Sequence, residues 1–220
     1  MGNVFDPDGV QAMTYTLNGG PEIPMGIGPD GRRLEEEGDF NIDLNVADLV
    51  TGVNTVSIWA IDNTNEESVR EVQVNYSDGG VWPLPYVIDW STAASIPDVS
   101  QVVAGNWSIT PDGVATMQSG YDRLIAVGDE LWEDYKIETT FETPESVGFF
   151  ESVGVALRWI GHNTNPPDNG TYQPLVGWAP LGGLAWYYHG AFEILTADAT
   201  GQEEILARDT TGMIIEPRKE

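Results

Sequence analysis

The residues of this chain best suited to ligand chemistry are aromatic side chains late in the sequence. Sugar rings stack their C–H faces on Trp and Tyr while neighbouring polar groups fix the hydroxyls. The candidates for such a carbohydrate site are Trp178, Trp186, Tyr187 and Tyr188, with Arg158 and Arg123 as polar partners. Because side chains alternate along a strand, Trp186 and Tyr188 must point one way and Tyr187 the other. At least one direction is therefore expected to face a core rather than a ligand.

Two acidic loops in the first part offer the hard oxygen ligands that calcium takes. One loop contains Asp6 and Asp8, and the other contains Asp62, Asn63 and Asn65. We interpret these five residues as a candidate Ca²⁺ site. The alternative is that both stretches are simply good turn formers.

Residues that could support catalysis are few. Glycoside hydrolysis needs paired carboxylates, about 5 Å apart in a retaining enzyme and farther apart in an inverting one. Glu138 and Glu142 share one side of a predicted strand, but that side is expected to face water, where solubility explains both. His162 and His189 have no Ser or Cys at a recognisable spacing. The sequence therefore predicts no catalytic site and no enzyme.

Composition restricts the class of protein. The 220 residues are 41% apolar with eight Trp and eight Tyr, which excludes a disordered chain. A net charge of −26, from 35 acidic and 9 basic residues, argues against nucleic acid and other polyanions as partners. No apolar run approaches the roughly 20 residues of a membrane helix. We expect a secreted or cell-surface location, with any export signal outside this chain, and no membrane insertion.

Period-2 patterns between turn signals recur throughout, whereas no apolar stripe with a helical period persists, so the chain is predicted to be all-β. The expected strands of the first part are residues 12–17, 40–44, 54–61 and 69–76. Those of the second part are residues 107–110, 121–127, 135–142, 153–160, 183–188, 192–196 and 205–208. Glycines and prolines at 78–85 mark a linker between domains at 1–77 and 86–220.

The first part resembles a bacterial immunoglobulin-like repeat. The resemblance rests on the acidic loop at Asp6-Pro-Asp8-Gly9, the strand ending in Asn18-Gly19, and the run from Gly52 to Asp62. It covers about residues 5–76 and implies a β-sandwich whose first two strands would precede Asp6. It also implies that the two acidic loops lie at the same pole of the fold.

The second part resembles concanavalin A-like and laminin-G-like jelly-roll modules. The resemblance is carried by residues 121–135, 154–159 and 182–187, and it extends from about Trp82 to the end. It implies a jelly-roll sandwich that would close with strands beyond this chain, so we expect a piece of a longer multidomain protein.

The leading hypothesis is a noncatalytic extracellular module pair, in which an immunoglobulin-like spacer carries a jelly roll that binds glycan or a surface protein. One alternative is an accessory part of a polysaccharide-degrading enzyme. Another is a purely structural stalk segment of an adhesin.

Overall fold

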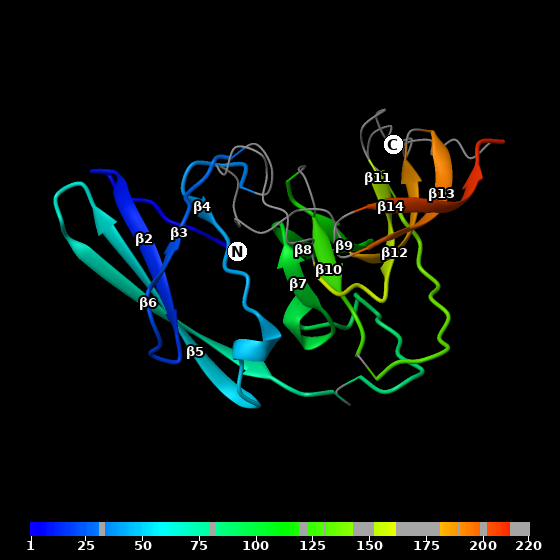
Figure 1. The fold of residues 1–220 in the computed structure, drawn as a ribbon, viewed down its shortest axis with the longest axis horizontal. Coiled ribbons are helices and arrows are strands. Elements are labelled where there is room, and N and C mark those ends of the chain that lie inside the picture. The colour runs from blue at the N-terminus through cyan, green and yellow to red at the C-terminus, as the bar shows by residue number, and fades with distance from the viewer. Residues whose placement is uncertain are drawn as a thin grey trace. The chain divides into compact units, whose positions relative to one another are not determined.

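The chain is all-β in the computed structural model, which describes residues 1–30, 34–79, 82–118, 123–129, 131–142, 152–161, 181–188, 190–198 and 202–211 (Figure 1). Within these ranges there are strands β1 to β14 and two single-turn 3₁₀-helices, but no α-helix. The predicted all-β class is therefore confirmed. None of the described helices has the length and hydrophobicity needed to span a membrane.

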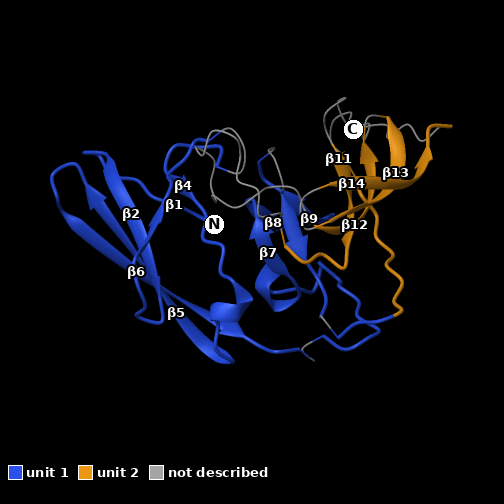
Figure 2. Ribbon diagram, in the orientation of Figure 1, with its two compact units in different colours: residues 1–133, 168–175 blue, residues 134–167, 176–220 orange. Residues whose placement is uncertain are grey.

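The chain divides into two compact units (Figure 2). The first contains residues 1–133 and 168–175, and the second contains residues 134–167 and 176–220. The predicted linker at 78–85 lies inside the first unit, although no described strand pairing joins its two sides. The boundary at 78–85 stays a prediction.

The largest sheet of the first unit has the order β3-β2-β5-β6, formed by Ile23–Met25, Val10–Leu17, Gly52–Asp62 and Glu67–Tyr76. Alternation along β5 gives it one packed face. Val56 and Met13, which is paired with Ala60, are each 3% exposed. On the opposite face, Trp59 is 37% exposed beside its cross-strand partner Val69. The even-numbered residues of β5 therefore face the packed side of the sheet.

A fully buried amide, Asn54, fixes the turns at one end of this sheet. Its Oδ1 accepts from Asn18 Nδ2 at 2.9 Å and from the backbone N–H of Val50 at 2.9 Å. Its Nδ2 donates to the carbonyl oxygens of Val50 and Gly52. All four hydrogen-bonding positions of the side chain are therefore filled, as burial of an amide requires.

The remaining strands of the first unit form three antiparallel pairs. These are β1 (Gly2–Asn3) with β4 (Asp39–Phe40), β7 (Gln101–Ala104) with β10 (Leu124–Ala126), and β8 (Trp107–Thr110) with β9 (Gly113–Thr116). The 3₁₀-helices are η1 (Val46–Asp48) and η2 (Ile96–Asp98). The strand predicted at 107–110 is confirmed at both ends, whereas those predicted at 40–44 and 121–127 are shorter than expected.

Aromatic side chains hold the Trp-Pro-Leu-Pro-Tyr segment within the first unit. The indole N–H of Trp132 donates to the carbonyl of Trp82 at 2.6 Å. The rings of Trp82 and Tyr86 stack with centroids 5.6 Å apart, and the Tyr86 hydroxyl donates to the carbonyl of Val99. This part of the predicted linker is therefore anchored by specific contacts.

The second unit contains one described sheet with the order β11-β12-β13-β14. Its strands are Ser152–Leu157, Gly182–Tyr188, Ala191–Ala197 and Glu203–Asp209, all antiparallel. Along β13, the side chains of Ala191, Glu193, Leu195 and Ala197 are buried, whereas Ile194 is 39% exposed. One face of this sheet is therefore packed and the other is open.

Two sequence-based expectations for this unit are wrong. Residues 135–142 form no strand, because no described strand pairs with them in a hydrogen-bonded ladder. The strand predicted at 153–160 ends at Leu157, since Arg158 adopts a left-handed backbone with φ 51°. Left-handed geometry turns the chain out of the sheet, so Arg158 does not continue the strand's alternation.

Candidate ligand-binding groove and acidic cluster

The open face of the β11–β14 sheet carries a groove of about 930 Å³. The residues that form its floor come from three strands, and all except Gly154 share the parity of Tyr187. They are Val153, Gly154, Val155 and Leu157 of β11, Ala185 and Tyr187 of β12, and Phe192 of β13. Register explains the grouping, because Val153 pairs with Tyr187 and Tyr187 pairs with Phe192. The floor is therefore aliphatic along β11 and aromatic where β12 meets β13.

The second wall of the groove is the extended segment that follows Asp134. Its lining residues are Tyr135, Ile137, Glu138, Thr139, Thr140 and Phe141. Ile137 is 43% exposed and Phe141 is 49% exposed, so apolar side chains border an open space. The apolar residues that alternate in this segment therefore line a groove, although the segment is not a strand.

The groove combines ring surfaces with a few polar groups. Hydroxyls come from Tyr135, Thr139, Thr140 and Tyr187, and Glu138 is the one carboxylate among the described lining residues. The Glu138 carboxylate accepts from Lys136 Nζ at 2.6 Å, and both side chains are 79% exposed. Aromatic surface with a small number of hydrogen-bonding groups is the usual composition of a ligand site.

The packed face of the same sheet holds Trp186 and Tyr188, whose ring centroids are 4.9 Å apart. The Trp186 indole N–H donates to Glu193 Oε2 at 3.3 Å, and Arg208 Nε lies 3.1 Å from Glu193 Oε1. Trp186, Glu193 and Arg208 are directly opposite one another on β12, β13 and β14. Tyr187 therefore points to the opposite side of the sheet from Trp186 and Tyr188, as predicted. The rings of Trp186 and Tyr188 belong to the packed side.

The structure separates the other predicted sugar contacts from the groove. Arg158 is exposed in the bend after β11 and is not among the described lining residues. Arg123 has a side chain that is 6% exposed and pairs with Glu35 at 3.2 Å in the first unit. Its stem packs against Gly105, where a Cβ would lie 2.5 Å from Arg123 Cδ. Arg123 is therefore a packed ion-pair residue. Trp178, His162 and His189 lie outside the described residues.

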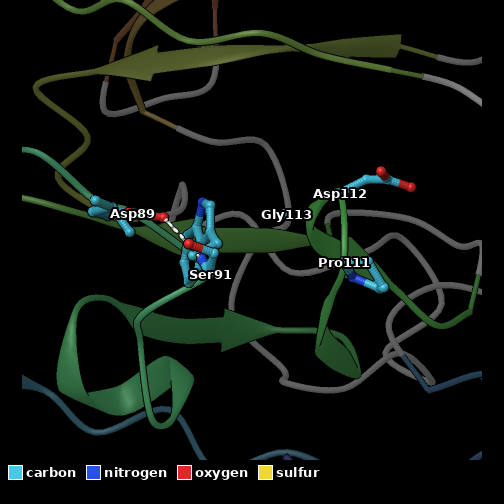
Figure 3. A pocket seen from close by; sticks show the side chains of 7 residues that line it. Asp89, Ser91, Pro111, Asp112 and Gly113 are labelled. Atoms are coloured by element: carbon cyan, nitrogen blue, oxygen red, sulfur yellow. Dashed lines mark hydrogen bonds between the residues drawn. The ribbon is translucent and has the colours of Figure 1, made fainter.

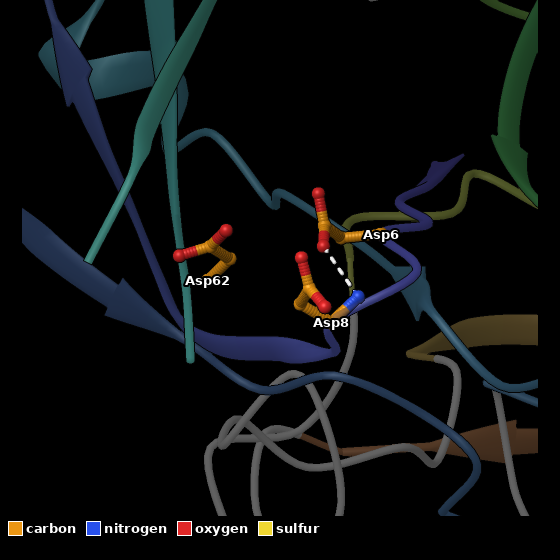
Figure 4. A group of neighbouring side chains, drawn as sticks. All are labelled: Asp6, Asp8 and Asp62. Carbon is orange, nitrogen blue, oxygen red and sulfur yellow. Dashed lines mark hydrogen bonds between the residues drawn. The ribbon is translucent and has the colours of Figure 1, made fainter. Parts of the chain in front are cut away.

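The two predicted acidic loops of the first unit do meet. One carboxylate oxygen each from Asp6, Asp8 and Asp62 lies within 4.8 Å of the others (Figure 4). The loops are joined by Asn63, whose Nδ2 donates to the Asp8 carbonyl at 2.7 Å and whose N–H donates to Gly9. This is the convergence that the immunoglobulin-like resemblance implied.

Asp62 also has a local structural role. Its carboxylate accepts from the backbone N–H groups of Thr64 and Glu66, each at 2.8 Å, and from the Thr64 hydroxyl. Hydrogen bonds from Glu66 and Thr64 hold the pKa of Asp62 below its ordinary value of 3.8, against the opposing effect of burial. Asn65 has φ 65° and its backbone N–H donates to the Asp62 carbonyl, so the role of Asn65 is to form the turn. Asp62 therefore caps the β5–β6 turn with or without a cation.

A smaller hollow of about 340 Å³ in the first unit is lined by residues 88–91 and 111–113 (Figure 3). The Asp89 carboxylate accepts from the N–H and hydroxyl of Ser91 at its edge. Figure 3 shows the Asp112 side chain directed away from Asp89 and Ser91. The two carboxylates do not converge, so this hollow is a weaker candidate than the groove.

Comparison with known proteins adds no relative, because no protein-family model, curated protein or solved structure matches this chain. The two family resemblances therefore remain hypotheses based on short motifs. Sequence reasoning missed Phe192, Tyr135 and Phe141 as groove residues. Two features of the sequence could have identified them. Phe192 follows Tyr187 across one hairpin turn, and the apolar residues 135, 137 and 141 occupy alternate positions.

Proposed function

We propose that this chain is a noncatalytic extracellular or cell-surface module pair whose second unit binds carbohydrate. The observation that carries the proposal is the groove on the open sheet face, where the cross-strand partners Tyr187 and Phe192 both line the floor. Its volume of about 930 Å³ is at the upper end of the range for small-ligand sites, which suits an oligosaccharide. Ring faces would stack on the sugars, and the hydroxyls of Tyr187 and Thr140 would bind their polar edges.

The noncatalytic assignment is supported by the lining itself. Glycosidases use two carboxylates across the scissile bond, whereas the described lining contributes Glu138 alone. The proposed domains are an immunoglobulin-like spacer at residues 1–77 and a concanavalin A-like jelly roll at residues 86–220. The pair would be part of a longer multidomain protein.

A glycan-array screen of the intact chain tests this proposal, followed by calorimetric titration of the best ligand. Tyr187→Ala should abolish selective binding, and Tyr187→Phe should retain stacking while losing a hydroxyl contact. Trp59→Ala is the matched control, because Trp59 is an exposed aromatic in the first unit. Absence of selective binding by folded wild-type protein would favour the structural stalk of an adhesin instead.

We also propose that Asp6, Asp8 and Asp62 bind Ca²⁺, with Asn63 holding the two loops together. Three carboxylates within 4.8 Å repel one another, and a divalent cation would relieve that repulsion. The ion would tie the loop before β2 to the turn after β5. Its role would be to stiffen the spacer, since these residues belong to the first unit and the groove to the second.

A further inference from the structure

The charge of the groove narrows the class of glycan that it can accept. Among the described lining residues, the side chain that is charged at neutral pH is Glu138. Among the other described basic residues, Arg208 pairs with Glu193 on the packed face and Arg123 pairs with Glu35 in the first unit. Arg70 and Arg158 are exposed and are not lining residues. The lining therefore presents a negative charge and offers no cation to an acidic ligand.

Lys136 does not cancel this effect for a bound ligand. Its ammonium contacts the Glu138 carboxylate at 2.6 Å, but Lys136 is not a lining residue and both side chains are 79% exposed. An exposed ion pair of this kind contributes little and exchanges readily with water or a competing cation. A ligand amine that enters the groove can take the place of Lys136 beside Glu138.

The net charge of the whole chain also disfavours acidic ligands. With a net charge of −26, the protein repels anions and raises the local concentration of cations at low ionic strength. A uronic acid or sulfated sugar in the groove would have its charge near Glu138 without a counterion. An amino sugar would place its ammonium there instead and gain a charge-assisted hydrogen bond.

From these observations, and resting on the proposed carbohydrate function, we infer that the groove selects oligosaccharides without acidic groups, with Glu138 as a specificity-determining residue that favours amine-bearing sugars. Neutral sugars bind by stacking on Tyr187 and Phe192. Amine-bearing sugars bind more tightly because they add the contact with Glu138. Acidic sugars are rejected although the aromatic floor could stack with them equally well.

Three hexasaccharides of equal length test this inference: a neutral N-acetylglucosamine hexamer, its de-N-acetylated glucosamine form, and a galacturonate hexamer. Calorimetric titration in low salt should show the acidic hexamer bound at least about tenfold more weakly than the neutral one. The amine-bearing hexamer should bind several-fold more tightly than the neutral one. Raising ionic strength to about 0.5 M should reduce both differences, because screening shortens the range of the Glu138 charge.

Glu138→Gln should bring the affinity for the amine-bearing hexamer to within about twofold of that for the neutral hexamer. Lys136→Gln is the matched control, equally exposed on the same segment, and it should preserve or increase the amine preference. Acidic hexamer bound as tightly as neutral hexamer would overturn the inference and leave the carbohydrate function standing. An amine preference that survives Glu138→Gln would also overturn it. Failure of every glycan on the array would refute the carbohydrate function and this inference together.

Discussion

Tyr187 and Phe192 lie directly opposite each other on β12 and β13, and both line the groove. The preceding pair on the same strands, Trp186 and Glu193, points to the other side, where Glu193 is 4% exposed. Two adjacent rungs of one hairpin therefore have different roles. The open face holds the proposed ligand, and the packed face stabilises the sheet.

Arg208 stabilises the sheet by neutralising a buried carboxylate. Arg208→Met would leave Glu193 with the Trp186 indole as its remaining side-chain partner among the described contacts, so we expect a loss of about 1–3 kcal/mol in the free energy of unfolding. The double variant Arg208→Met, Glu193→Met removes both charges and should recover most of that loss. Urea unfolding of the two variants and the wild type measures the difference. A double variant less stable than Arg208→Met would contradict this role.

The Asn54 side chain stabilises turns of the first unit through the hydrogen bonds that it donates as well as those that it accepts. In Asn54→Asp the carboxylate cannot donate to the carbonyls of Val50 and Gly52, and a charge is buried, so about 2–4 kcal/mol of stability should be lost. Asn75→Asp is the control, since Asn75 is exposed on β6, and its effect should stay within about 0.5 kcal/mol. Denaturant unfolding would show equal effects at the two positions if Asn54 had no special role.

Ca²⁺ should raise the melting temperature of the wild type over that in chelator, because it binds the folded cluster in preference to the unfolded chain. Asp8→Asn should remove this increase. In chelator the same variant should be at least as stable as the wild type, since one of three neighbouring charges is gone. Thermal unfolding with calcium, magnesium or EDTA makes the comparison. A wild type that is indifferent to calcium would eliminate the proposed metal site.

Acid should destabilise the first unit in part through Asp62. Its pKa is lower in the folded state than its ordinary value of 3.8, so the ionised carboxylate stabilises the fold above that value. This contribution is lost as the pH falls through the folded-state pKa. Asp62→Asn should therefore lose less stability than the wild type between about pH 6 and about pH 3. Asp78→Asn controls for the change in charge at an exposed position, and identical pH profiles for Asp62→Asn and wild type would exclude this role.

Local pattern was sufficient to predict much of the fold. The alternation from residue 54 to 61 correctly predicted the existence of β5, and residues 107–110 matched β8. The segment 135–142 failed because alternation reports where apolar side chains point, but a strand also needs a neighbouring backbone, which no local pattern supplies. The very short strands β1 and β3 carried too few residues for any period to be recognised.

The candidate sites also depended on long-range contacts that a local sequence pattern does not predict. Strand parity correctly separated Tyr187 from Trp186, but parity alone cannot tell which face is open, since that depends on distant segments. Arg158 was misplaced because its left-handed backbone breaks the alternation at one residue. Asp6, Asp8 and Asp62 could be grouped in advance because the expected order of loops determined which ones meet. The Glu193–Arg208 pair required the register of β13 against β14, which the sequence did not reveal.

In the proposed function the open face binds carbohydrate, whereas the packed face holds the sheet together. Parallel thermal unfolding and glycan titration of Tyr187→Ala and Trp186→Ala separate these two roles. We predict that Tyr187→Ala loses binding at least about tenfold with a stability change of roughly 1 kcal/mol. Trp186→Ala should lose about 3 kcal/mol of stability, and its remaining folded fraction should bind normally. Loss of binding in Trp186→Ala with full binding by Tyr187→Ala would contradict the assignment of the two faces.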